Sequence, residues 1–290
     1  MDDIELLAKG ESNLKKQILL VESFTQDIGM TFGLDKCNIL HLKRGKAVNE
    51  GSVRLQGGGV IEHLVEGHTY TYLGMQVRDK LQNAHIKDKL RAEYKSRLKK
   101  IWSSELNARN KVKATNTFAV PVLSYSFGII DWTRDDITSL DRLTRRVMSD
   151  NRAHHPRSSI NRLYMSINSG GRGLINVEAL HDRMLLCTFA HIYLSDDPLV
   201  AHVKTHDESK DFHSYFKRAK VVGQNLNFDV NYVDGEVLLD GTQMCVNQVK
   251  SFTKSAQSRL FKEKLSEKPL HRVYVQCVEQ NSSPRDSLPG

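Results

Sequence analysis

The sequence predicts an α+β protein, in which a region of strand, helix and strands precedes a mainly α-helical region. Two changes of pattern along the chain support this prediction. Before residue 79, short apolar runs alternate with a period of two and are separated by glycine-containing turns. From Lys80 the apolar period changes to about 3.6 residues and stays helical for more than a hundred residues. Beyond Asp197 the sequence becomes more polar, and we assign no domain type to residues 201–280.

Residues 1–78 are expected to form one helix and several strands. The expected elements are an opening strand at 4–8, a helix from the N-cap Ser12 to a stop at Gly29, a strand at 37–42, a hairpin at 53–64 that turns at 57–59, and one alternating strand at 70–77. This order of elements is compatible with one domain.

Residues 79–200 are expected to form a helical region. The predicted helices are 82–106, 110–129 with a kink at Pro121, 134–149 and 175–195, with a loop at 169–174. In residues 201–280, Asp234-Gly235 predicts a hairpin and 246–264 a helix, and residues 281–290 are expected to be a disordered tail. We expect Trp102 and Trp132 in the core rather than as platforms on which bases stack.

Composition favours a globular protein inside the cell. The chain is 39% apolar and 26% charged, which is typical of folded domains. Its four cysteines lie far apart and predict neither a disulfide framework nor a zinc site, which fits a reducing compartment. The sequence contains no secretory leader, and the uncharged stretch 114–130 is too short and too polar to span a bilayer. We therefore expect a cytoplasmic or nuclear location.

The positive charge is concentrated in one segment. Residues 80–113 contain eleven basic and three acidic residues, so this segment alone carries the net charge of +8. Leu90, Tyr94, Leu98 and Ile101 recur at helical spacing, which places the basic residues on the other faces of an amphipathic helix. A concentrated positive face attracts phosphate backbones. A solvated basic helix without a partner is the alternative.

Three motifs carry a resemblance to a known family. Met1-Asp2-Asp3 resembles the end of the Tyr/Phe-Met-Asp-Asp box of reverse transcriptases. The stretch GMTFGLDKCNIL is similar to the next palm motif of non-LTR (LINE-type) retrotransposon polymerases, Gly-x-x-x-Asn-x-x-Lys-Thr, with Gly33 in place of Asn, Cys37 in place of Thr, and Lys36 retained. The stretch YTYLGM resembles the strand that grips the primer.

The order of the motifs extends the resemblance to about residues 1–200. The helical segments NKVKATNTFAVPVLSYSFGIIDW and SGGRGLINVEAL look like the thumb and the segment behind it in these elements. The resemblance implies a truncated palm at 1–78, followed by a helical thumb and connection at 79–200. It also implies descent from the RNA-directed DNA polymerase of a retrotransposon Pol polyprotein.

The resemblance implies a role for each motif. Asp2 and Asp3 would bind Mg²⁺, because hard carboxylate ligands suit the two-metal chemistry of nucleotidyl transfer. Lys36 would stabilise or protonate the leaving pyrophosphate. Tyr72, Leu73 and Gly74 would form the primer grip. The backbones of the RNA template and DNA primer would contact the basic residues Lys87, Arg91, Lys95, Arg97, Lys99, Lys100, Lys111 and Lys113.

The metal site is expected to be incomplete in this chain. In the family a third aspartate lies on an earlier palm strand, and the resemblance places that strand and the fingers before Met1. We therefore expect primer and template binding without polymerisation, and no cofactor beyond Mg²⁺ and nucleoside triphosphates. The alternatives are a non-catalytic helical module that binds nucleic acid and a helical scaffold that binds none. The sequence does not indicate an oligomeric state.

Overall fold

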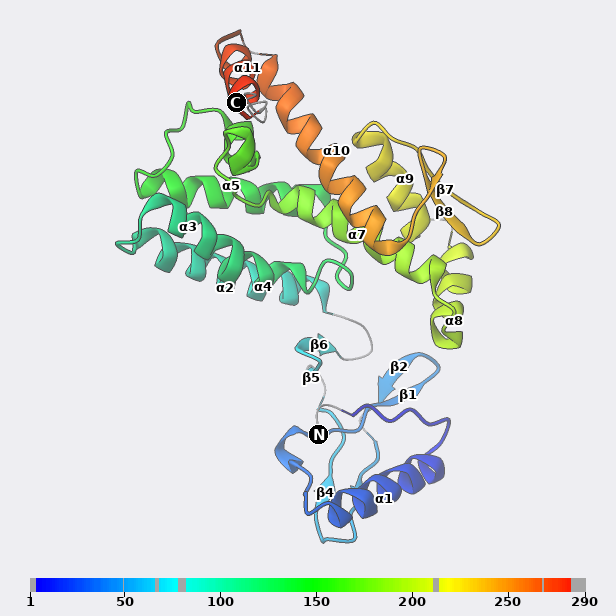
Figure 1. The fold of residues 1–290 in the computed structure, drawn as a ribbon. Helices are drawn as coiled ribbons and strands as arrows, with labels where there is room; N and C mark the ends of the chain where they lie inside the picture. The colour runs from blue at the N-terminus through cyan, green and yellow to red at the C-terminus, as the bar shows by residue number, and fades with distance from the viewer. Residues whose placement is uncertain are drawn as a thin grey trace, which may run out of the picture. The chain divides into compact units, whose positions relative to one another are not determined.

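The structure is a computed structural model that describes residues 4–48, 50–65, 68–77, 82–210, 214–267 and 269–282 (Figure 1). It confirms an α+β protein that is mainly helical. The chain divides into two compact units, Met1–Asp88 (unit 1) and Lys89–Gly290 (unit 2). None of the helices within the described ranges is long and apolar enough to cross a bilayer.

Unit 1 consists of one long helix, one short 3₁₀ helix and three antiparallel hairpins. Its elements are α1 (Glu11–Asp27), η1 (Leu34–Lys36), β1 (His41–Lys43) paired with β2 (Lys46–Val48), β3 (Val53–Arg54) paired with β4 (Val60–Ile61), and β5 (Tyr70–Tyr72) paired with β6 (Met75–Val77). In the described part of the unit each sheet has only two strands. A small core forms where α1 meets the second hairpin, at Ile18, Val53, Leu55 and Ile61.

A buried carboxylate connects α1 to the turn of the β3–β4 hairpin. Glu22 is 3% exposed. One of its oxygens accepts a hydrogen bond from the backbone N–H of Gln56 at 3.0 Å, and the other accepts one from Gly57 at 2.8 Å. Because hydrogen bonds to a charged group are stronger than neutral ones, Glu22 fixes this glycine-rich turn against the helix.

Replacing Glu22 by alanine is expected to loosen the β3–β4 hairpin, since two backbone donors lose their acceptor. Such a loss costs about 2 kcal/mol. Trypsin cleavage after Arg54, which lies next to the turn, should accelerate at least tenfold in the Glu22→Ala variant. Glu11→Gln removes an exposed pair with Lys15 on the same helix and should leave this cleavage rate unchanged. Equal cleavage rates in both variants would contradict the role of Glu22.

Helix α1 ends where the sequence predicted, but it begins at a different residue. The predicted N-cap Ser12 is wrong, since the helix begins at Glu11 after the extended residue Gly10. Gly29 is left-handed at φ 71°, and its N–H bonds to the carbonyl of Gln26 while that of Met30 bonds to Thr25. These two bonds form a Schellman motif, which confirms the predicted stop.

Two predicted strands before residue 45 are wrong in part or in full. Residues 4–8 form no strand, and no strand of the described chain pairs with them; Leu6 packs against the core beside α1 instead. The strand expected at 37–42 begins only at His41, although Ile39 makes a parallel bridge to His63. A strand needs a partner for its backbone groups, and apolar content alone does not supply one.

Residues 70–77 form a hairpin, so the predicted single strand is wrong. Tyr72 pairs with Met75, and the chain reverses at Leu73 and Gly74, whose φ angles are 47° and 77°. Two successive positive φ angles are the signature of the type I′ turn that joins antiparallel strands. A hairpin with a two-residue turn keeps the alternation of sides in each arm, so periodicity did not reveal it. The 53–64 segment, by contrast, forms the predicted hairpin, with its turn at 56–58, one residue before the predicted 57–59.

Unit 2 is a helical assembly with one small sheet, and α2 enters it across the boundary from unit 1. Its elements are α2 (Asn83–Ser103), α3 (Ala108–Ala114), the π-helical η2 (Thr115–Ala119), α4 (Val120–Ser124), α5 (Arg134–Asp150), α6 (Ile160–Tyr164), η3 (Ile167–Ser169), α7 (Val177–Leu194), α8 (Pro198–Glu208), α9 (Tyr215–Asn225), β7 (Val230–Val233), β8 (Glu236–Leu239), β9 (Thr242–Gln243), α10 (Val246–Ser266) and α11 (Pro269–Ser282).

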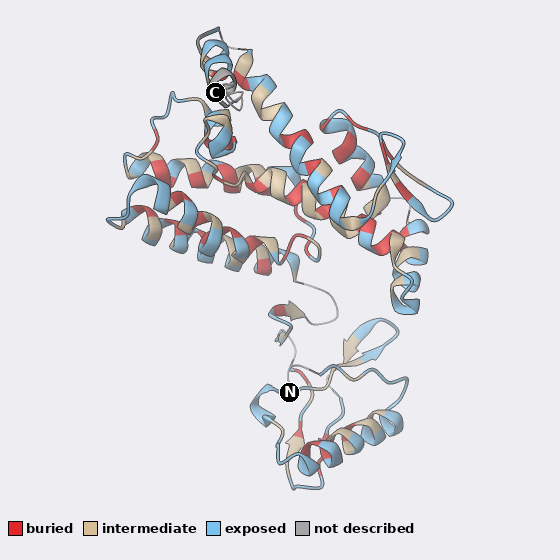
Figure 2. Ribbon diagram, in the orientation of Figure 1, coloured by how far each residue is buried: buried red, intermediate tan, exposed pale blue. Residues whose placement is uncertain are grey.

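Helix α7 is the centre of unit 2. It packs against α5, α9 and α10, which surround it (Figure 1). Buried positions recur along it, among them Leu185, Leu186 and Phe189 (Figure 2). The same hydrophobic cluster includes residues from α9, the β7–β8 hairpin and α10. Residues after 200 therefore share one core with the helices before them.

Most helices of unit 2 confirm their predictions. The helices predicted at 82–106, 134–149, 175–195 and 246–264 correspond to α2, α5, α7 and α10, and Asp234-Gly235 forms the predicted hairpin turn. The helix predicted at 110–129 is instead divided into α3, the π segment and α4, and it ends at Ser124. Pro121 lies just after the π segment, where its missing N–H disturbs the regular helical bonds.

Four helices of unit 2, α6, α8, α9 and α11, were not predicted, and part of the predicted tail is helical. The short α6 lies between two predicted helices. α8, α9 and α11 lie in the polar region after Asp197, where the apolar period is weak. Residues 281 and 282 end α11, so the disorder predicted for them is wrong. The remainder of the predicted tail, 283–290, lies outside the described residues.

Candidate nucleic-acid interface

The predicted catalytic residues belong to unit 1. Asp2 and Asp3 lie outside the described residues. Lys36 is the last residue of η1 and is exposed. Within the described ranges, no group of three or more His, Cys, Asp or Glu side chains lies close enough together to hold a metal ion. The described residues therefore supply no further ligand set for Mg²⁺, and we derive no catalytic step through the metal.

The predicted primer grip lies on the β5–β6 hairpin. Tyr72 is half-buried in β5, whereas Leu73 and Gly74 form the exposed turn. Leu73 is 51% exposed, and its φ of 47° is a left-handed conformation that is uncommon for a leucine. The backbone of these two residues is thus presented at a hairpin tip rather than within a strand.

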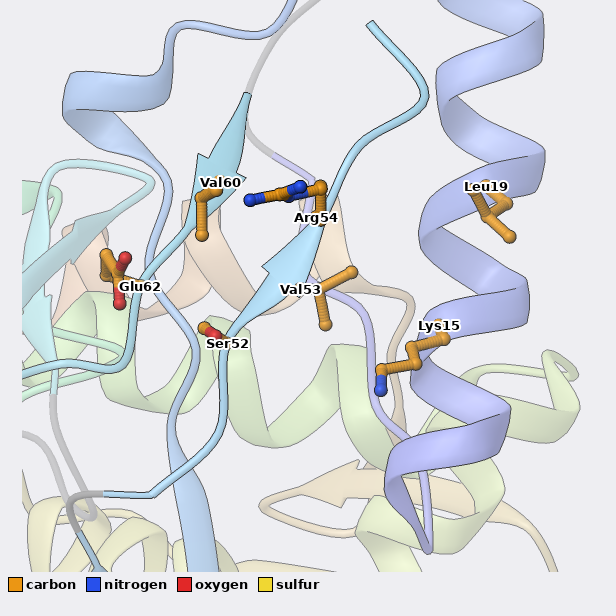
Figure 3. Close-up of a pocket in the computed structure, with 7 residues that line it drawn as sticks. All are labelled: Lys15, Leu19, Ser52, Val53, Arg54, Val60 and Glu62. Atoms are coloured by element: carbon orange, nitrogen blue, oxygen red, sulfur yellow. The ribbon is translucent and has the colours of Figure 1, made fainter. Parts of the chain in front are cut away.

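An open recess lies between α1 and the β3–β4 hairpin (Figure 3). It has a volume of about 550 Å³ and is lined by Lys15, Leu19, Ser52, Val53, Arg54, Val60 and Glu62. Lys15 pairs with Glu11 at 2.7 Å. The remaining cation, Arg54, shares the recess with the carboxylate of Glu62 (Figure 3). Neither sign of charge prevails there, so the recess does not favour an anionic ligand.

Helix α2 buries one narrow face, as its period predicted. Tyr94 and Leu98 are fully buried and Trp102 is 1% exposed. The Tyr94 hydroxyl lies 2.7 Å from that of Thr144 on α5, and burial raises the pKa of Tyr94 well above its ordinary range. Because a charged side chain is costly to bury, the lysines and arginines of α2 occupy its remaining faces.

Three of the predicted basic residues are engaged within unit 2. Arg91 donates to the hydroxyl of Ser139 at 3.1 Å and pairs with Asp136 at 3.5 Å, both on α5. Arg97 bonds to Glu93 at 2.6 Å and to the carbonyl of Phe118 at 2.8 Å. Lys111 donates to the carbonyl of Trp102 at 3.0 Å. These side chains brace α2 against its neighbours, so part of their donor capacity is already used.

The other predicted basic residues point to solvent. Lys95, Lys99, Lys100 and Lys113 are exposed, and none of their side chains forms an ion pair or hydrogen bond with another described residue. Lys89 and Arg109, on the same two helices, are also exposed. Lys87 is half-buried. Of the predicted contacts, these four lysines are therefore the ones best placed to meet a ligand.

Two arginines on α5 extend the basic surface and were not predicted. Arg91, Lys95 and Lys99 form one row along α2, since residues four apart share a face. Ser139, which contacts Arg91, begins a similar row on α5 that continues through Arg142 and Arg146, both exposed.

Helices α2 and α5 advance in the same direction. The contact of Arg91 with Ser139 is followed further along both helices by the contact of Tyr94 with Thr144. One carboxylate, Asp150, lies a turn beyond Arg146 and limits the positive surface at that end. We define the basic rows as Lys95 and Lys99 on α2 together with Arg142 and Arg146 on α5.

Comparisons with known proteins do not assign a family to this chain. No protein-family model matches the chain, and a search of curated proteins finds no significant match either.

Proposed function

We propose that this chain binds the phosphate backbone of a nucleic acid through the basic rows, as the palm end and thumb of a non-LTR retrotransposon reverse transcriptase. The observation that carries the proposal is the set of exposed lysines on α2, which have no partner among the described residues. Helix α2 is rigidly held by its buried face, so these charges are displayed at fixed spacing. Neutralised phosphates release counterions, which drives such binding.

The basic rows are suited to binding the backbone of a primer and template duplex, without preference for a base sequence. The lysines of α2 and the arginines of α5 would contact phosphates, and such contacts carry no direct information about base identity. In the intact parent enzyme, Asp2 and Asp3 would hold Mg²⁺ for nucleotidyl transfer, with Lys36 at the pyrophosphate and Tyr72–Gly74 at the primer end. These assignments rest on the sequence motifs.

Replacing Lys95 and Lys99 together by glutamine is expected to weaken binding of a labelled RNA–DNA duplex about tenfold at moderate salt. The slope of log affinity against log salt should fall by about 2, since each phosphate contact contributes about 0.9. Fluorescence anisotropy of the full chain at several salt concentrations measures both quantities.

A matched pair on α10 provides the control for this experiment. Lys250 and Lys254 are exposed, have the same four-residue spacing and belong to the same unit. Neutralising them should change neither the affinity nor the salt slope by more than a small fraction. The same loss in both variants would show that binding follows net charge alone and would refute the site.

A module that binds nucleic acid without catalysis is the second candidate, since the basic rows alone would serve it. Primer extension separates the two functions. Activity that depends on Asp2 would support the polymerase, whereas duplex binding that is unchanged in Asp2→Asn, without primer extension, favours the module.

A further inference from the structure

An exposed apolar row runs along the π segment and α4. Phe118 is 61% exposed, and Tyr125 is 55% exposed. Pro121, also exposed, lies between them at spacings of three and four residues, which places the three on neighbouring turns. The exposed aromatic rings are a finding of the structure. Exposed aromatic rows of this kind mark binding surfaces more often than isolated apolar residues do.

Positive charge borders this row. The Arg97 guanidinium donates to the carbonyl of Phe118 at 2.8 Å and is itself 44% exposed. Lys100, three residues further on α2, lies on the same flank and is exposed. A guanidinium has five N–H donors, so Arg97 keeps donors for a further acceptor beside its bonds to Glu93 and Phe118.

This combination selects a particular kind of anionic partner. A nucleic-acid duplex presents phosphates and hides the faces of its bases in the stack, so an exposed phenylalanine adds little to its binding. A single strand offers both phosphates and base faces, and proteins bind it by combining cations with aromatic platforms. Charge complementarity and an exposed ring therefore favour single-stranded nucleic acid over duplex at this surface.

We propose that Phe118 is a stacking platform for an unpaired base of a single-stranded nucleic acid, whose phosphates contact Arg97 and Lys100. The proposal rests on nucleic-acid binding by the same helix and adds the strand state of the ligand. The basic rows on the α5 side of α2 would take the duplex backbone, while this surface on the other flank takes a strand that leaves the duplex.

The test compares three probes bound to the full chain: an RNA–DNA duplex, an oligothymidylate of about 15 nucleotides, and an abasic strand of the same length. Phe118→Ala should weaken oligothymidylate binding about tenfold and change duplex and abasic-strand binding less than twofold. Phe118→Trp should restore the affinity. Leu199→Ala, which removes an apolar side chain that is 76% exposed from α8, is the control and should change none of the three.

The outcomes separate this inference from the proposed function. If the duplex binds and responds to Lys95 and Lys99 but Phe118→Ala leaves oligothymidylate binding unchanged, the stacking platform is refuted and the basic rows stand. If Phe118→Ala instead abolishes self-association in sedimentation velocity without changing any affinity, the occupant is a second copy of the chain and the inference is also refuted. If no probe binds the wild-type chain, both proposals fail.

Discussion

Replacing Asp141 by alanine is expected to lower the free energy of unfolding of unit 2 by about 3 kcal/mol. Asp141 is 3% exposed on α5 and holds the start of α7. Its oxygens accept hydrogen bonds from the backbone N–H groups of Val177 and Glu178, at 3.0 and 3.1 Å, and from the side chain of Asn176 at 3.0 Å. Alanine leaves these buried donors without an acceptor at the end of the central helix.

The pH dependence of Asp141 gives a second readout. Burial raises its pKa to about 6, although the hydrogen bonds from Val177 and Glu178 and the charge of Arg145 act in the opposite direction. The folded state therefore binds a proton more tightly than the unfolded state, whose carboxyl has a pKa near 3.8. The contribution of this proton to stability is fully present below about pH 4 and is lost as the pH rises through 6.

Asp141→Asn isolates that contribution, because it keeps the shape and removes the titration. The difference in unfolding free energy between wild type and Asp141→Asn should be up to about 3 kcal/mol larger at pH 4 than at pH 7, since one pKa unit corresponds to about 1.4 kcal/mol. Urea unfolding followed by tryptophan fluorescence measures it, as both tryptophans, Trp102 and Trp132, lie in unit 2. Asp150→Ala, on the exposed end of α5, is the control. Parallel pH profiles for Asp141→Asn and wild type would contradict the assignment.

Replacing Gly171 by alanine is expected to cost at least about 3 kcal/mol, because the added methyl group has no space. The new Cβ would overlap the backbone carbonyl of Met165 and lie 2.5 Å from the Met165 side chain. The loop cannot easily move aside. The N–H of Gly171 bonds to Ser166 at 2.8 Å, and that of Gly173 bonds to Met165 at 2.8 Å.

Gly128→Ala is the matched control for Gly171→Ala in the same unit. There the added Cβ would meet only the Thr188 hydroxyl, at an ordinary distance of 3.4 Å. Its midpoint in urea should stay close to that of wild type, whereas Gly171→Ala should shift the midpoint strongly or prevent soluble expression. Similar midpoints for the two variants would show that the loop at 169–174 adjusts freely.

The sequence predicted the fold best where one face of a long helix is buried. The bounds of α5 follow from its 3.6-residue period, and its start is fixed by Thr133, which forms a capping box with Asp136. Prediction was poor where tertiary partners decide the structure. At 70–77 the same alternation is compatible with one strand and with a hairpin. The hairpin depends on positive φ angles at Leu73 and Gly74, and a leucine does not indicate such an angle.

The candidate interface was predicted as a charge pattern but not as a surface. The basic helix and its buried face follow from the sequence, whereas the engagement of Arg91 and Arg97 does not. Apart from Glu93, which lies one turn from Arg97, their partners lie 21 to 48 residues away along the chain, on α5 and the π segment. For the same reason, Arg142 and Arg146 could not be joined to Lys95 and Lys99 before the contact between the two helices was known. Arg172, in the loop at 169–174, donates to the carbonyl of Ala153, a partner 19 residues away that the sequence does not indicate.

The central position of α7 has a consequence for how sequences of this kind can vary. A helix that packs on three neighbours has almost no free face, so most of its positions accept only side chains of similar volume. The outer face of α2 obeys a different rule, since any side chain that keeps the charge fits there. Random mutagenesis with selection for the folded chain would therefore leave α7 nearly unchanged and allow the exposed lysines of α2 to vary widely, whereas Arg91 and Arg97, which contact neighbouring elements, would vary less.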